Sequence, residues 1–224
     1  MDMLEIVKKN TPPAQGNCIY VVSANARFET YFNEQECNFI KSSIDDDKQI
    51  VHINRFSSQA FVVNVQPKKE NWLTKELLRK RGADLFKQAC SLKLTDITIA
   101  DLTDDSDYGL SFLEGFYLSS YQFIGYFKDK DKKQNSLTRL GFYGKLPVSE
   151  IKKNINLWES VSQTKTFVNQ PVIHLPSHEY IDAIGKISRE TGITCTVYNK
   201  QWLTEQGMGG ILAVNKGSVD EPYL

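Results

Sequence analysis

Two histidines have the spacing in this chain that comes closest to a metal site. His174 and His178 are four residues apart, which on a helix would place both imidazoles on one face, as zinc requires. However, Pro176 lies between them and interrupts a helix, and no H-E-x-x-H motif is present. A structural role, or a position in the first turn of a helix, is therefore favoured. His52 stands alone in an apolar stretch and is expected to be a core or edge histidine.

A group of aspartates could suggest calcium binding. Asp101, Asp104, Asp105 and Asp107 lie close together, but the glycine and the terminal glutamate of an EF-hand are not at their required offsets. Carboxylates before a helical stretch commonly cap the free N–H groups of the first turn. We therefore expect helix capping and a solvated loop.

The glycines near the end of the chain and a charged run in its middle have simple structural interpretations. Gly207, Gly209 and Gly210 lack the G-x-x-x-x-G-K-[ST] pattern of a phosphate loop, so a turn or close helix packing is favoured. The charged run is expected to be an exposed hairpin or loop, because lysines and aspartates alternate along it. Its members are Lys128, Asp129, Lys130, Asp131, Lys132 and Lys133.

Composition excludes several classes of protein. Among 224 residues, Lys+Arg and Asp+Glu both number 27, so no net field attracts nucleic acids or anionic membranes. The four cysteines, at positions 18, 37, 90 and 195, are scattered and predict free thiols. The chain begins without a basic and apolar leader, and no apolar run is long enough to cross a membrane. We expect a globular cytoplasmic protein with no membrane partner and no nucleic-acid partner.

The elements that must position any site alternate between strands and helices, which favours an α/β sandwich with a mixed sheet. The expected strands are Leu4–Val7, Cys18–Val22, Ile50–Ile53, Phe61–Val65, Asp96–Ala100 and Leu137–Tyr143, the third and fourth forming a hairpin. The expected helices are Glu70–Ser91, Tyr108–Phe127, Ser149–Val168 and Ser177–Thr191, the last closed by Gly192. A strand Ile193–Tyr198 and a short helix are expected before the final glycines, as the start of a second, incomplete α/β unit.

Several motifs resemble the leucyl (cytosol) aminopeptidase family. Gly207–Ser218 is similar to that family's "GMGGLLAV..GS" segment, and Glu114–Phe123 to its "EG..L..Y.F..Y" helix, where small residues allow close packing onto the sheet. Gly82–Leu85 and Thr194–Tyr198 match further family patterns in the expected order. Val168–Pro171 stands where relatives carry "LVNTPPN", with a glutamine in place of the usual threonine, which suggests a divergent branch. The resemblance covers roughly the last two thirds of the chain.

This resemblance implies a two-domain metallopeptidase. It predicts a macro-like amino-terminal domain at 1–145, a linker helix at 146–170 and the beginning of a catalytic domain at 171–224. The full-length enzyme would be a cytoplasmic hydrolase that uses two divalent metals, zinc or manganese, to remove N-terminal residues from peptides, and it would assemble as a hexamer. No residue up to Leu224 matches the family's "GKG..FD.GG" or "NTDAEGR" metal signatures. We therefore expect no catalytic, cofactor-binding or metal-binding residue in 1–224, and a role in architecture and assembly beside a downstream catalytic domain.

A different class of function stays open as an alternative. A macro-like domain could act as a stand-alone module that binds a ligand or a nucleic acid, although no glycine-rich phosphate loop follows a strand before Gly109. The two readings differ in what they require of the second unit. A stand-alone protein should complete its own sheet, whereas part of an aminopeptidase need not.

Overall fold

The computed structural model describes residues 4–13, 15–23 and 26–224. Contacts between Cα atoms divide the chain into two compact units, Met1–Ser162 and Gln163–Leu224. The division falls inside helix α5 (Val148–Asn169), which matches the helix expected at Ser149–Val168. The domain limits inferred from the family resemblance stay a prediction.

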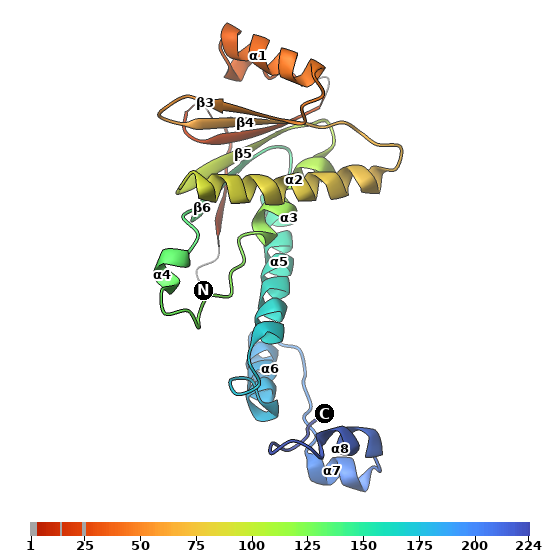
Figure 1. Cartoon of the computed structure of the whole chain (residues 1–224). Helices are drawn as coiled ribbons and strands as arrows, with labels where there is room; N and C mark the ends of the chain where they lie inside the picture. The colour runs from red at the N-terminus through yellow and green to blue at the C-terminus, as the bar shows by residue number, and fades with distance from the viewer. Residues whose placement is uncertain (1–3, 14, 24–25) are drawn as a thin grey trace. The chain divides into compact units, whose positions relative to one another are not determined.

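A mixed six-stranded sheet organises the first unit, as the sequence predicts (Figure 1). Its strands are β1 (Glu5–Lys8), β2 (Cys18–Val22), β3 (Ile50–Asn54), β4 (Gln59–Asn64), β5 (Asp96–Leu102) and β6 (Arg139–Tyr143). The spatial order is β1-β6-β5-β2-β4-β3, and every neighbouring pair is parallel except the β3–β4 hairpin. All the parallel strands therefore end at one edge of the sheet.

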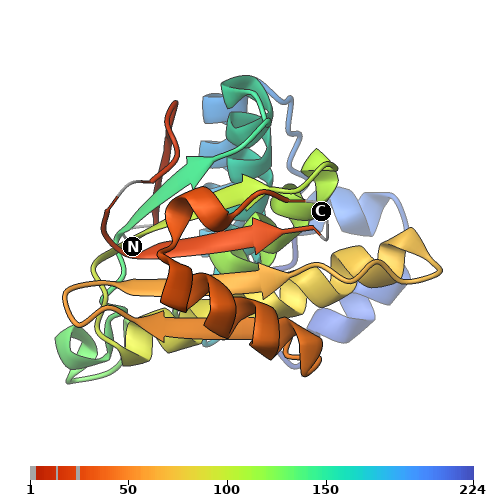
Figure 2. The ribbon, with the colours of Figure 1, turned by 90° about the horizontal axis from the view of Figure 1, so that it is seen from above.

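Helices cover both faces of this sheet. Helix α1 (Glu34–Asp45) lies over one face, and α2 (Asn71–Ser91) and α3 (Ser106–Leu118) lie over the other (Figures 1 and 2). The central strand β2 shows the consequence, because all five of its residues are buried. Ile19 and Val21 join the core under α2 and α3, while Tyr20 and Val22 join the core under α1. This explains why β2 is a continuous apolar run rather than an alternating one.

Helices α2 and α3 approach each other at glycines. A Cβ atom built on Gly115 would lie 2.0 Å from the carbonyl oxygen of Arg79, and one built on Gly82 would lie 2.3 Å from that of Phe112. The expectation that the small residues of Glu114–Phe123 allow close packing onto the sheet is therefore wrong about the partner. Gly115 packs against the backbone of the neighbouring helix, because a side chain there would hold the two helices apart.

Three further details differ from the expected elements. Helix α3 ends at Leu118, well before the predicted Phe127, and the following residues form loop structure up to the four-residue helix α4 (Lys130–Lys133). Helix α1 and the short 3-10 helix η1 (Glu29–Tyr31) were not anticipated. The N-terminus of α1 nevertheless carries a capping box, in which Asn33 and Glu36 each accept a hydrogen bond from the other's backbone N–H.

The second unit contains the end of α5 and three further helices, α6 (Ser177–Thr191), α7 (Lys200–Glu205) and α8 (Gly209–Asn215). Gly192 ends α6 in the left-handed conformation, with φ of 74°, as expected of a C-terminal glycine. The predicted strand Ile193–Tyr198 is absent from the described residues of this unit. Instead the backbone of Tyr198 exchanges two hydrogen bonds with that of Leu224, at 2.8 and 3.0 Å. No strand among the described residues of this unit lies beside these two residues, so their pairing does not extend into a sheet.

Among the helices that the structure describes, none combines the length and the apolar character needed to span a membrane.

Candidate functional site

The two histidines with zinc-like spacing do not form a metal site with the residues described. The backbone N–H of His174 donates to the carbonyl of Pro171 in the turn before α6, at 2.8 Å. His178 lies in the first turn of α6, with Nδ1 3.8 Å from Oδ1 of Asp220 and Nε2 3.9 Å from a carboxylate oxygen of Glu179. The expected place of His178 in an N-terminal turn is thus confirmed. No group of three or more His, Cys, Asp or Glu side chains that could hold a metal occurs in the described part of the chain, so these residues do not fit a two-metal centre.

His52 is an edge-strand residue, as expected. It lies in β3, at one end of the strand order, and its Nε2 is 2.7 Å from Oε1 of Gln59 across the hairpin. Its ring stacks on Phe61 with a centroid separation of 4.4 Å and an interplanar angle of 11°. These contacts satisfy the side chain and give it a structural role.

The aspartate group divides into a cap and a buried acid. Asp105 is the N-cap of α3, and its side chain accepts a hydrogen bond from the backbone N–H of Asp107 at 2.9 Å, which confirms the capping prediction. Asp101 departs from the expected solvated loop, because it is the sixth residue of β5 and is 5% exposed. Its Oδ1 accepts from the N–H and hydroxyl of Thr103 at 3.0 and 2.7 Å. Burial raises the pKa of Asp101 to about 6, partly offset by these hydrogen bonds and by the charge of Lys145.

The charged run and the final glycines have the surface roles expected of them, with one difference. Residues 128–133 are exposed, but the lysines after Asp129 form the helical turn α4 rather than a hairpin. Gly207 adopts φ of 65° after α7, which confirms the expected turn. Gly209 and Gly210 start α8, and a Cβ atom on either would meet nothing within 4 Å, so close packing does not require them.

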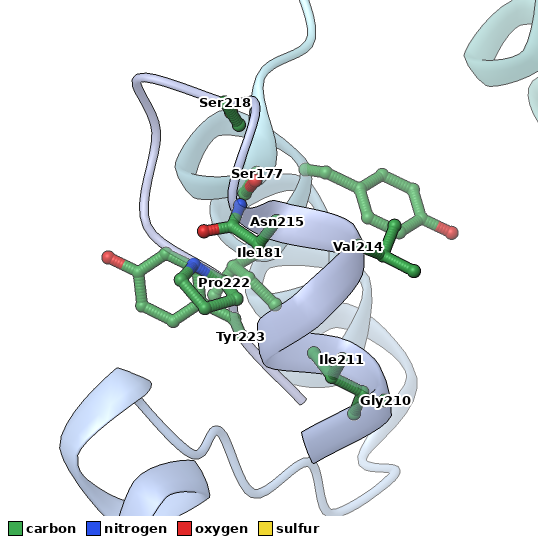
Figure 3. Close-up of a pocket in the computed structure, with 10 residues that line it drawn as sticks. Ser177, Ile181, Gly210, Ile211, Val214, Asn215, Ser218, Pro222 and Tyr223 are labelled. Carbon is green, nitrogen blue, oxygen red and sulfur yellow. The ribbon is translucent and has the colours of Figure 1, made fainter. Parts of the chain in front are cut away.

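The second unit contains an apolar groove of about 590 Å³ between α6, α8 and the terminal segment (Figure 3). Ile181 of α6, Ile211 and Val214 of α8 and the rings of Pro222 and Tyr223 contribute to its wall. No Asp, Glu, Lys, Arg, His or Cys residue lines it. The groove can therefore hold apolar groups, and its lining has no His, Lys or carboxylate that could activate the hydroxyls of Ser177 and Ser218 for peptide hydrolysis.

The chain has a mixed α/β fold that two solved enzymes share over part of their length. A tomato leucine aminopeptidase mutant matches with a TM-score of 0.73 at 17% identity, over 98% of this chain and 49% of that one. The bottromycin maturation enzyme BotP matches with a TM-score of 0.68 at 16% identity, over 93% and 45%. At such identities these matches show the fold.

Sequence comparison points to one family. Residues 162–224 match the model of the cytosol aminopeptidase family, catalytic domain. The probable cytosol aminopeptidase of Sulfurihydrogenibium sp. is 27% identical over 166 residues, covering 69% of this chain and 32% of the relative. That of Corynebacterium glutamicum is 29% identical over 166 residues, covering 73% and 32%. The chain spans about a third of the length of these curated relatives. Together with the structural match, these findings support the assignment of the chain to the cytosol aminopeptidase family.

Proposed function

We propose that this chain provides the amino-terminal architecture and the first part of the catalytic domain of a leucyl aminopeptidase, which removes N-terminal residues from peptides. The observation that carries the proposal is the match of residues 162–224 to the family's catalytic domain. The proposed enzyme depends on two divalent metals, zinc or manganese. A structural neighbour, BotP, was solved in complex with Mn, which favours manganese as one candidate. Because the described residues do not fit a metal centre, we place the metal ligands outside them.

The first unit has the properties of an architectural domain. Its sheet is covered on both faces, and its buried residues form two continuous apolar clusters. We propose that it is the macro-like amino-terminal domain of the family, that α5 links it to the catalytic part, and that it contributes to a hexamer in the complete enzyme. The name that the curated relatives share, cytosol aminopeptidase, supports a cytoplasmic location.

The second unit has too little core to be a complete domain. Among its described residues, only Leu203 and Pro222 are buried. Val172, Ile173 and Val214 are 79%, 80% and 89% exposed. Apolar side chains exposed in such numbers on so few residues favour coverage by further protein. In our proposal the rest of the catalytic domain provides that cover.

The first experiment measures hydrolysis of leucine p-nitroanilide in the presence of manganese or zinc. The full-length Sulfurihydrogenibium relative serves as the positive control for metal, substrate and buffer. We expect metal-dependent turnover from the relative and none from the 224-residue chain. Metal-dependent turnover by the chain, clearly above a blank without protein, would contradict the placement of the ligands outside the described residues.

Hydrogen exchange separates this proposal from a stand-alone macro-like module. If the second unit is part of a larger domain, its amides from Ile193 to Val214 should exchange much faster than those of β3 and β5 in the isolated chain. The measurement is made on chain shown to be monomeric, because self-association would protect exposed segments. Equal and strong protection in such a monomer would favour the stand-alone module instead.

A further inference from the structure

A cavity of about 470 Å³ lies at the carboxyl edge of the sheet in the first unit. The carboxyl ends of β5 and β6 and the segments that follow β1, β2, β5 and β6 contribute to its lining, at positions 10, 27, 101–104 and 143–145. From β2 the chain leads through α1 to the β3–β4 side of the sheet, whereas from the neighbouring β5 it leads through α3 to the β6 side. Such a switch in direction leaves a crevice at the carboxyl ends of the strands, which is where open α/β sheets bind ligands.

Asp101, whose carboxylate is buried, contributes to the lining of this cavity and packs closely against two glycines. A Cβ atom on Gly109 would lie 2.2 Å from Oδ2 of Asp101, and one on Gly144 would lie 2.9 Å from its Cβ. Only glycine therefore fits at either position without displacing the acid. Thr103 satisfies Oδ1, but Oδ2 has no hydrogen-bond donor among the described residues. A buried carboxylate oxygen without a donor is costly unless another molecule supplies one.

Charges of both signs surround the same cavity. Arg27 and Lys145 are exposed cations in its lining, and neither forms an ion pair within 4.0 Å with another described residue. Asp104 contributes an exposed carboxylate, which accepts a hydrogen bond from the hydroxyl of Ser23 at 3.3 Å. A purely anionic ligand would meet the aspartates, and a purely cationic one would meet Arg27 and Lys145. A ligand that carries both charges is matched to the whole lining.

We propose that this cavity binds a small zwitterion of the free α-amino acid class. The ligand carboxylate pairs with Arg27 and Lys145, and its ammonium group donates to the aspartate side, at Asp104 and Asp101. Guanidinium and carboxylate groups form strong charge-assisted hydrogen bonds of this kind. An aminopeptidase releases such molecules, so the idea that the ligand is a reaction product rests on the proposed function. Binding itself does not.

The test is isothermal titration calorimetry on the full 224-residue chain at pH 7.5 and low salt. The probes are L-leucine, L-arginine and L-glutamate, compared with N-acetyl-L-leucine and L-leucinamide, each of which lacks one of the two charges. We expect at least one free amino acid to bind, and the two blocked derivatives to bind at least roughly tenfold more weakly than leucine or not at all. Absence of binding by all three amino acids at millimolar concentration would overturn the proposal.

Variants locate the site. Arg27→Gln and Lys145→Gln remove one exposed cation each, so the fold should be unaffected, and each is expected to weaken binding roughly tenfold. Lys128→Gln is the matched control, because it removes the same charge from an exposed position outside the cavity, and its affinity should equal that of the wild type. Binding that survives both cavity variants unchanged would refute the assignment. Either result leaves the peptidase proposal intact, since that proposal is tested by hydrolysis.

Discussion

The contact between α2 and α3 gives a sharp test of the fold, through the substitution Gly115→Ala. A Cβ atom at this position would lie 2.0 Å from the carbonyl oxygen of Arg79 and 2.6 Å from that residue's carbonyl carbon and Cα. Real Cβ atoms essentially never come within 3.0 Å of such neighbours. The obstacle is backbone inside a 21-residue helix, so it cannot rotate away as a side chain could. The two helices must therefore move apart.

The size of the effect follows from two opposing contributions. Overpacking of a well-packed interior costs about 1–3 kcal/mol, and a clash with backbone belongs at the upper end of that range. Alanine is better than glycine inside a helix by about 1 kcal/mol, which offsets part of the cost. We expect the free energy of unfolding of the first unit to fall by about 2 kcal/mol.

Urea unfolding followed by fluorescence measures this change in a Trp72→Phe, Trp202→Phe background, where Trp158, which is buried in the first unit, is the remaining tryptophan. With a urea m-value of about 2 kcal/mol/M, the midpoint should fall by about 1 M. Gly125→Ala is the control, since a Cβ atom there would meet nothing within 4 Å, and its midpoint should stay close to that of the wild type. Equal midpoints for the two variants would refute the close approach of the helices.

Two further predictions concern a buried acid and a helix end. Burial raises the pKa of Asp101 from 3.8 to about 6, so between these pH values the folded chain binds more protons than the unfolded chain and loses stability as the pH rises, by about 3 kcal/mol. In Asp101→Asn this loss should disappear, so the urea midpoint of the wild type should fall more between pH 4 and pH 7 than that of the variant. Identical pH profiles would contradict the raised pKa of Asp101. Gly192→Ala places a side chain at φ of 74° and should destabilise α6 by about 1 kcal/mol. Gly185→Ala, within the same helix, is the control and should be neutral or stabilising. Thermal unfolding followed by circular dichroism compares the two variants.

The sheet of the first unit was predictable because its buried strands are runs of apolar residues in the sequence. Strand β2 is apolar throughout since both of its faces are covered, and β4 differs from it only at its polar ends. Helix α1 escaped prediction because Cys37, Ile40 and Ser43 are its only buried residues, which is a weak apolar stripe. Its capping box was nevertheless visible in the sequence as an asparagine followed three residues later by a glutamate.

The cavity at the edge of the sheet could not be predicted from local pattern. Asp101 and Asp105 are both aspartates near the start of a helix, so both read as capping or loop residues. Their environments differ because Gly109 and Gly144, from two separate segments, close over Asp101 and leave Asp105 partly exposed. Burial of an acid by residues distant in sequence is a tertiary property, and only the folded chain displays it.

The absence of the predicted strand from the second unit also depends on tertiary contacts, because a segment with strand propensity needs a sheet to join. Residues 193–198 contain β-branched and apolar side chains that favour a strand, yet Ile193 is 66% exposed and Val197 is 42% exposed. Strand propensity measures how well a side chain fits a pleated and half-buried surface, so it has little effect where no such surface exists. The backbone bonds between Tyr198 and Leu224 are the only regular pairing that this segment makes among the described residues. If further protein covers the second unit as we propose, the same residues should acquire strand pairing on its addition, and their amides should then exchange as slowly as those of β5.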